Sequence, residues 1–294
     1  MSHNDQPSND RGIIFGLILN STYTVIEFVF GILTGSLALI ADATHNLTDT
    51  FTLAVSYFAN RLAKREANES KTYGYGRATI LAALINASVM LAVAGLIAFE
   101  AIKRLQNPVE IEGGIVAAVA LIGVAVNGSI AYVLSKRRQD LNMKSAFIDM
   151  TFDALSSVGA VIAGLIMLFT NFKYADSIIG LIIAALLLYN TLKIFREAIQ
   201  ILLEGTPNDV DLENINRAIT NVPKVSRVDD IHVWVIRSGY NALSCHIIIE
   251  ESELQNSRKI VESVKYTLQT NHKIQHATIE VELEDCDDLH KKVS

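Results

Sequence analysis

The segment LIADATHNLTDTFTLAVSYFAN (39–60) is apolar over the length of a membrane helix, yet it carries His45 and Asp49 near its middle. A spacing of four residues places both side chains on one face of a helix, one turn apart. An ionisable side chain at the depth of a bilayer costs about 3 kcal/mol on insertion scales. We therefore expect this pair to face a water-filled cavity or to share a bound ligand.

Hydrophobic residues make up 50% of the 294 residues, and they are distributed unevenly. Residues 12–204 are mostly apolar, whereas residues 205–294 have the composition of a soluble domain. A helix needs about 20 apolar residues to cross a bilayer core about 30 Å thick. Six transmembrane helices explain the apolar stretches more simply than a soluble bundle of buried helices does. The six stretches lie at about 12–33, 37–60, 78–101, 113–135, 145–169 and 176–200.

Basic residues set the expected orientation of these helices. They concentrate in two connections, RLAKREANESK (61–71) and SKRRQDLNMK (135–144). Because an excess of Lys and Arg marks the cytoplasmic side, both chain termini are expected in the cytoplasm. The polar start MSHNDQPSND lacks the pattern of a cleavable signal peptide. We expect an integral protein of a bacterial inner membrane.

The pattern changes after EGTPND (204–209). Helical spacing marks 210–222, with Asp209 or Asp211 as its cap, and 251–271. Alternating or β-branched runs mark strands at 225–237, 242–250 and 276–283. The order α-β-β-α-β predicts a small cytoplasmic α+β domain built on one sheet. The predicted fold class is thus an α-helical membrane protein with six transmembrane helices and this added domain.

The fifth apolar stretch repeats the spacing of the second. Asp149 and Asp153 are also four residues apart, so two membrane helices each present two metal-competent side chains. A single residue of this kind is more often satisfied by a neighbouring carbonyl or by a cap, but two matched pairs favour a shared ion. One imidazole and three carboxylates can build a tetrahedral site for a divalent metal.

Several motifs carry a resemblance to a known family. GSLALIADATHNLTD (35–49), TYGYGRATILAALIN (72–86) and FIDMTFDALSSVGAVIAG (147–164) resemble the cation diffusion facilitators, which are metal-ion/proton antiporters and often zinc exporters. The likeness continues through VDDIHVW (228–234), ALSCHIIIE (242–250) and HATIEVE (276–282). It implies a homodimer in which each chain has a polar tail (1–11), a six-helix membrane domain (12–204) and a ferredoxin-like cytoplasmic domain (205–294) that binds metal and dimerises.

The resemblance also places the transport site. It falls on His45, Asp49, Asp149 and Asp153, and it implies alternating access with protons as counter-ions. Zinc-transporting members commonly have His at the position of Asp149. Loss of an imidazole makes the site harder and more negative, which suits Mn²⁺ or Fe²⁺ better than an imidazole-rich site does. We predict Zn²⁺ as the main substrate, with Mn²⁺, Fe²⁺, Co²⁺ and Cd²⁺ as alternatives.

Further polar residues are weaker candidates. Glu27 and Asn20 lie in the first apolar stretch, where they could support a proton path or join helices. The resemblance suggests a hinge charge pair between Arg77 and Glu204. It also suggests a regulatory metal site in the cytoplasmic domain. The candidate ligands of that site are His232, His246, His276, Glu282, Asp285 and Cys286, against the alternative that strand histidines simply pack or face solvent.

Composition and motifs argue against other classes of function. The net charge of −6 speaks against general binding of nucleic acid, which favours basic surfaces. The absence of an H-E-x-x-H motif speaks against a membrane metallohydrolase, so we predict that the protein is not an enzyme. Two alternatives stay open: a passive metal channel, whose flux would ignore a pH gradient, and a membrane-anchored metal sensor, which would leave the intramembrane pairs unused.

Overall fold

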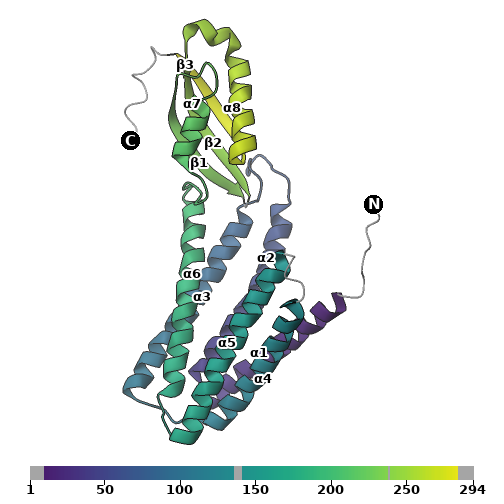
Figure 1. Cartoon of the computed structure of the whole chain (residues 1–294), viewed down its shortest axis with the longest axis vertical. Coiled ribbons are helices and arrows are strands. Elements are labelled where there is room, and N and C mark those ends of the chain that lie inside the picture. The colour runs from purple at the N-terminus through teal and green to yellow at the C-terminus, as the bar shows by residue number, and fades with distance from the viewer. Residues whose placement is uncertain (1–9, 136–140, 238, 284–294) are drawn as a thin grey trace. The chain divides into compact units, whose positions relative to one another are not determined.

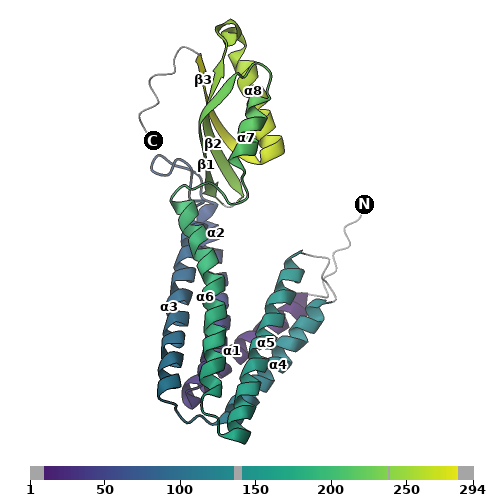
Figure 2. The ribbon, with the colours of Figure 1, turned by 60° about the vertical axis from the view of Figure 1, so that its left-hand side comes forward.

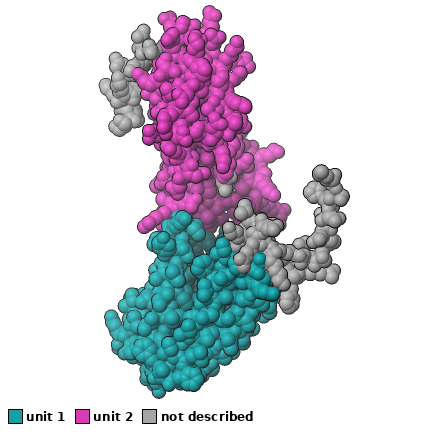
Figure 3. Space-filling model, in the orientation of Figure 1, with its two compact units in different colours: residues 1–55, 85–194 teal, residues 56–84, 195–294 magenta. Residues whose placement is uncertain are grey.

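The structure is a computed structural model that describes residues 10–135, 141–237 and 239–283. The chain divides into two compact units, residues 1–55 with 85–194 and residues 56–84 with 195–294 (Figure 3). Each of the six predicted apolar stretches forms one long helix (Figure 1). These helices are α1 (Asp10–Thr34), α2 (Leu37–Ala63), α3 (Ala78–Gln106), α4 (Gly113–Ser135), α5 (Leu141–Thr170) and α6 (Ala175–Leu202).

Within the described residues, four helices are long and apolar enough to cross a membrane: α3, α4, α5 from Phe147 onward, and α6. The apolar part of α1, Ile18–Thr34, is shorter. Helix α2 is the least apolar of the six, because His45, Asn46 and Asp49 occupy its middle. The helical membrane domain is therefore established by four clear spans, and the count of six remains a prediction.

The core of the first unit is built from small side chains contributed by α2 to α6. Ala38, Ala94 and Ala120 are completely buried in it. Helices α4 and α5 lie side by side (Figure 2) and touch through their backbones, since a Cβ atom on Gly113 would come within 2.5 Å of the Gly164 carbonyl oxygen. Small residues at such a contact let membrane helices approach closely where no hydrophobic effect drives them together.

Large apolar side chains cover the outside of the first unit. Phe99, Phe169 and Tyr189 are each exposed by more than two thirds of their surface. Soluble proteins rarely expose so much contiguous apolar surface. These side chains are suited to contact with lipid acyl chains.

One buried carboxylate fixes the beginning of α2. Asp176, in the first turn of α6, accepts hydrogen bonds from the Leu37 backbone N–H at 2.7 Å, the Ala38 N–H at 3.3 Å and the Ser36 hydroxyl at 2.5 Å. Ser36 Oγ in turn accepts from the Leu39 N–H at 3.2 Å. Three of the N–H groups that a helix start leaves without partners are thereby satisfied in a fully buried position.

The second unit contains a three-stranded sheet with strand order β1-β2-β3. Strands β1 and β2 are antiparallel and β2 and β3 are parallel. The elements are α7 (Leu212–Thr220), β1 (Arg227–Arg237), β2 (Tyr240–Ile249), the 3-10 helix η1 (Glu251–Asn256), α8 (Ser257–His272) and β3 (Ile274–Leu283). The predicted order α-β-β-α-β is confirmed. Over the described residues this is the ferredoxin-like order without its first strand.

Apolar side chains from one face of this sheet form the core with α7 and α8. Leu243, Ile247 and Ile249 of β2 are fully buried there, together with Ile219 of α7 and Leu268 of α8. Alternation along β2 sends every second residue to the opposite face, which carries His246. The core face thus fixes which side chains are available for polar contacts.

Two details of this domain refine the sequence predictions. Asp211, one of the two caps considered, accepts hydrogen bonds from the N–H groups of Glu213 and Asn214 at the start of α7. The predicted helix 251–271 is divided, because residues 251–256 form η1 before α8 begins at Ser257. Helical periodicity in a sequence does not separate one tight 3-10 turn from an α-helical turn.

The contacts of Asp176 predict its contribution to stability. Replacement Asp176→Ala leaves buried N–H groups at the start of α2 without acceptors, so we expect a loss of about 1–2 kcal/mol, the cost typical of a lost helix cap. Thermal unfolding in detergent micelles measures it. Thr22→Ala is the control, because that exposed hydroxyl donates to the Ile18 carbonyl of its own helix. Equal melting temperatures for both variants would show that the cap is unimportant.

Candidate metal centre

Helices α2 and α5 face each other through His45 and Asp153. The Nε2 atom of His45 lies 3.7 Å from Oδ1 of Asp153. The Asp153 side chain is 5% exposed and the His45 side chain is 33% exposed. The predicted convergence of the two membrane pairs is therefore seen for one member of each.

A second contact between the same helices defines their register. Ser157 donates a hydrogen bond to Asp42 Oδ2 at 2.9 Å, and both residues are buried. Asp42 lies one turn before His45 on α2, and Ser157 lies one turn after Asp153 on α5. The order of the two contacts shows that α2 and α5 are antiparallel. Continued by one helical turn, the same register brings position 49 opposite position 149.

The remaining two predicted ligands are placed less completely. Asp149 is exposed on α5, near enough to His45 for electrostatic interaction. Asp49 lies on α2, but its side chain is outside the described part of the structure. In the described part, no three His, Cys, Asp or Glu side chains converge so as to hold a metal ion. A complete site therefore depends on the side chain of Asp49.

The polar residues of the first apolar stretch both lie on α1. Glu27 is completely buried and accepts a hydrogen bond from the Tyr23 hydroxyl at 2.9 Å. Asn20 lies two turns earlier, and its Oδ1 atom is buried without a hydrogen-bond partner among the described residues. Glu27 is near enough to Asp42 and Asp153 for electrostatic interaction, so it belongs to the surroundings of the candidate site.

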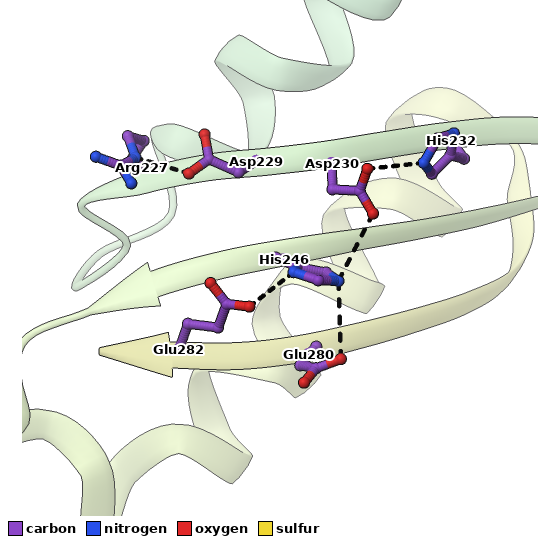
Figure 4. Close-up of polar contacts among 7 residues, drawn as sticks. All are labelled: Arg227, Asp229, Asp230, His232, His246, Glu280 and Glu282. Atoms are coloured by element: carbon purple, nitrogen blue, oxygen red, sulfur yellow. Dashed lines mark hydrogen bonds and ion pairs between the residues drawn. The ribbon is translucent and has the colours of Figure 1, made fainter. Parts of the chain in front are cut away.

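In the cytoplasmic domain, His246 is the centre of a polar cluster on the outer face of the sheet (Figure 4). Its Nδ1 atom lies 2.8 Å from Glu282 Oε1. Its Nε2 atom lies 3.7 Å from Glu280 Oε2 and 3.8 Å from Asp230 Oδ2. Asp230 also contacts His232, with Nε2 and Oδ1 2.8 Å apart. Two of the three predicted histidines are thus linked through one carboxylate.

Two members of the cluster, Asp230 and Glu280, are not among the residues predicted from the sequence. Glu280 could have been found from strand pairing and alternation. Strand β3 pairs with β2 so that Glu280 is opposite His246, and alternation puts Glu282 on the same face. No sequence pattern points to Asp230, because this residue lies at an irregularity in β1 and has a positive φ of 52°. A bulge redirects side chains in a way that strict alternation does not predict.

The other predicted cytoplasmic ligands lie elsewhere. His276 is opposite Ala242 on β2, four residues along the strand from His246. Its ring packs edge-on against Tyr73, with centroids 6.1 Å apart. Asp285 and Cys286 are outside the described residues. Cys245 is on the core face, and burial raises the pKa of its thiol to about 11, so it is a packing residue.

The predicted hinge pair is in contact. Arg77 Nη2 donates to Glu204 Oε1 at 3.2 Å and to the Val235 carbonyl at 3.3 Å. The side chains are 35% and 65% exposed, respectively. Arg77 thereby joins the residue that follows α6 to strand β1 within the second unit.

Comparison with known proteins identifies the class. Residues 13–203 match the family model "Cation efflux transmembrane domain", and residues 207–284 match "Cation efflux protein, cytoplasmic domain". Together these matches cover most of the chain, so the protein belongs to the cation diffusion facilitator family of membrane transporters. The resemblance found in the motifs is confirmed.

Individual relatives match over nearly the whole chain. The "Cadmium, cobalt and zinc/H(+)-K(+) antiporter" of Bacillus subtilis is 35% identical, covering 97% of this chain and 93% of the relative. The "Metal cation efflux system protein CzcD" of Cupriavidus metallidurans is 36% identical (97% and 90%). The "Zinc transporter ZitB" of Escherichia coli is 31% identical (97% and 91%). The solved metal-bound C-terminal domain of the CzcD transporter of C. metallidurans matches 25% of this chain and all of that domain, with 28% identity and a TM-score of 0.24.

The Arg77–Glu204 contact generates a charge-reversal prediction. Arg77→Glu or Glu204→Arg alone places like charges together, and the double reversal restores attraction. Because both side chains are partly exposed, the coupling free energy should be small, about 0.2–1 kcal/mol. A double-mutant cycle of melting temperatures in detergent measures it at low and high salt. If the double variant is no more stable than the sum of the two single changes implies, the contact does not contribute.

Proposed function

We propose that the protein is a proton-coupled antiporter that exports a divalent metal cation, principally Zn²⁺, from the cytoplasm. The observation that carries this proposal is the antiparallel α2–α5 interface, in which His45 lies 3.7 Å from Asp153 beside the Asp42–Ser157 hydrogen bond. Its register extends to the Asp49 and Asp149 positions. Charged side chains inside a membrane domain mark ion pathways far more often than they serve packing.

The chemistry of the four side chains supports a first-row divalent metal. One imidazole nitrogen and three carboxylate oxygens suit Zn²⁺, and the excess of oxygen ligands extends the range toward Mn²⁺ and Fe²⁺. The names of the relatives include zinc, cadmium and cobalt as substrates. Zn²⁺ is therefore the first expected substrate, with Co²⁺, Cd²⁺, Mn²⁺ and Fe²⁺ as the alternatives to be measured.

Coupling to protons follows from the ligands. A metal ion binds neutral imidazole and ionised carboxylate, so its binding releases protons. Protons arriving from the other side of the membrane compete for the same atoms. Metal and protons would therefore exchange at the same atoms, the imidazole nitrogen of His45 and the oxygens of the carboxyl groups.

The rest of the chain completes the proposed transporter. Residues 12–204 form the membrane domain with six spans and both termini in the cytoplasm, and residues 205–294 form the cytoplasmic domain. The family model matched by residues 207–284 also has the short name ZT_dimer, which supports a homodimer. Arg77 and Glu204 act at the hinge between transport and cytoplasmic segments. Glu27 and Asn20 support the proton path.

We further propose that the cytoplasmic domain binds a regulatory metal ion at the outer face of the sheet. The sequence candidates His246, His232 and Glu282 lie in one polar cluster with Asp230 and Glu280, which supports this proposal. These five side chains do not converge on one point in the described structure, so metal binding would require them to rearrange. His276, Asp285 and Cys286 are the remaining sequence candidates. A membrane-anchored sensor would use this same cluster, and only transport measurements separate that function from antiport.

Transport by the membrane site is tested with Asp153→Asn and Asp49→Ala. Each removes an anionic ligand, so both variants should lose at least about 90% of zinc flux, equal to more than about 1.4 kcal/mol of lost transition-state stabilisation. Zinc uptake into proteoliposomes with an imposed pH gradient measures the flux. Thr151→Ala is the matched control, because this α5 hydroxyl bonds its own helix at Phe147. Normal flux in Asp153→Asn would remove the assignment.

The cytoplasmic site is tested in a chain whose transport site has been disabled by Asp153→Asn. Calorimetric titration of the full-length protein in detergent should show residual zinc binding that His246→Ala weakens by about 10-fold or more, as expected when one of few ligands is removed. His272→Ala is the control, since this histidine lies at the end of α8 and is not a candidate ligand. Equal affinities in the two variants would place the regulatory metal elsewhere.

A further inference from the structure

Two carboxyl groups of the membrane domain meet away from the four proposed ligands. Glu27 on α1 is completely buried, and Asp42 on α2 is 1% exposed. Among the described residues, no Lys or Arg side chain forms an ion pair with either. The donors around them are neutral hydroxyls: Tyr23 donates to Glu27, and Ser157 donates to Asp42.

The two carboxyl groups interact electrostatically, and the hydroxyls that donate to them, those of Tyr23 and Ser157, both border Gly123. Ionised carboxylates only accept hydrogen bonds, so the two groups can bond to each other only when one of them carries a proton. One oxygen of each, Oε2 of Glu27 and Oδ1 of Asp42, is buried without a donor among the described residues. Two unpaired anions in such a place would be too costly, whereas one shared proton removes a charge and satisfies the contact.

Within the described part of the chain, the groups around the pair are hydroxyls and members of the proposed transport site. Helix α4 passes at Gly123, where a Cβ atom would overlap the Tyr23 hydroxyl and lie 2.8 Å from Ser157 Oγ. The titratable groups that act on the pair are Tyr23 on α1, His45 on α2 and Asp153 on α5. Asp42 is three residues from His45, and Ser157 is four from Asp153, so the pair is about one helical turn from the metal site.

We propose that Glu27 and Asp42 form a proton-binding site that holds one shared proton when the transport site is empty and releases it to water when a divalent cation binds at His45 and Asp153. The release follows from electrostatics, because a cation about one turn away repels the proton in an apolar interior where charges interact strongly. The site would thus carry a counter-ion of its own, in addition to protons on the metal ligands. This proposal rests on the proposed antiport function.

Proton release on metal binding tests it. Zinc is titrated into the full-length protein in detergent, in buffers of different ionisation enthalpy, to give the number of protons released per metal bound. Glu27→Gln, Asp42→Asn and the double variant should each release about one proton fewer than the unchanged protein, with the double variant losing no more than either single change. Unchanged proton release with retained zinc binding would overturn the proposal. So would additive losses, which indicate two independent protons.

The control is Glu100→Gln on α3, whose carboxylate pairs with Arg104 at 3.0 Å and should leave proton release unchanged. Asp153→Asn separates failure of the transport site from failure of the proton-binding site. If this variant still transports zinc, the proposed transport site is wrong regardless of the Glu27 result. If the variants fail to fold, infrared difference spectroscopy of the unchanged protein tests the proposal without them. Metal addition should remove a deuterium-sensitive band of a protonated carboxyl group, and absence of that loss contradicts the proposal.

Discussion

The structure of the membrane domain depends on the cost of placing carboxyl groups among apolar helices. Asp42 and Asp153 are nearly inaccessible to solvent, and Glu27 is completely so. In bulk hydrocarbon each carboxyl group would form an ion pair, take up a proton or move to the aqueous surface. The surrounding helices provide short hydroxyl donors and one imidazole, with no permanent cation among the described residues nearby. Such an environment has a deficit of positive charge that a metal ion or protons can fill.

Asp176 shows how a different environment produces a structural role from the same residue type. Its carboxylate accepts from two backbone N–H groups and from Ser36, so its hydrogen-bonding capacity is used. The groups around Asp42 leave one oxygen without a donor. The comparison separates a buried acid that fixes a helix end from a buried acid that is suited to exchange a proton. The bonds of Asp176 anchor α2 at its first turn, ahead of the proposed ligands.

Much of this organisation was predictable from the sequence, because it follows from period and composition. The six long helices and the α-β-β-α-β order come from apolar length and alternation, and the His45–Asp153 contact comes from matched i, i+4 pairs. The partners of these residues were not predictable. Ser157 and Asp42 meet only through the relative rotation of two helices, and Asp230 joins His232 and His246 only because β1 is irregular there. Tertiary geometry of this kind leaves no periodic signal.

The substitution of Asp149 for the histidine common in zinc transporters changes the charge balance of the whole region. With Asp49, Asp153, Glu27 and Asp42 it makes five carboxyl groups on three helices, against one imidazole. Full ionisation of these groups would be costly in a membrane interior, so the proposed function leads us to expect protons on some of them in the metal-free state. Under the proposed function, a divalent cation entering this region would displace protons because the total charge is limited by desolvation. Exchange of metal for protons would then be a property of these groups together, and it would not require that any one residue act as the sole proton carrier.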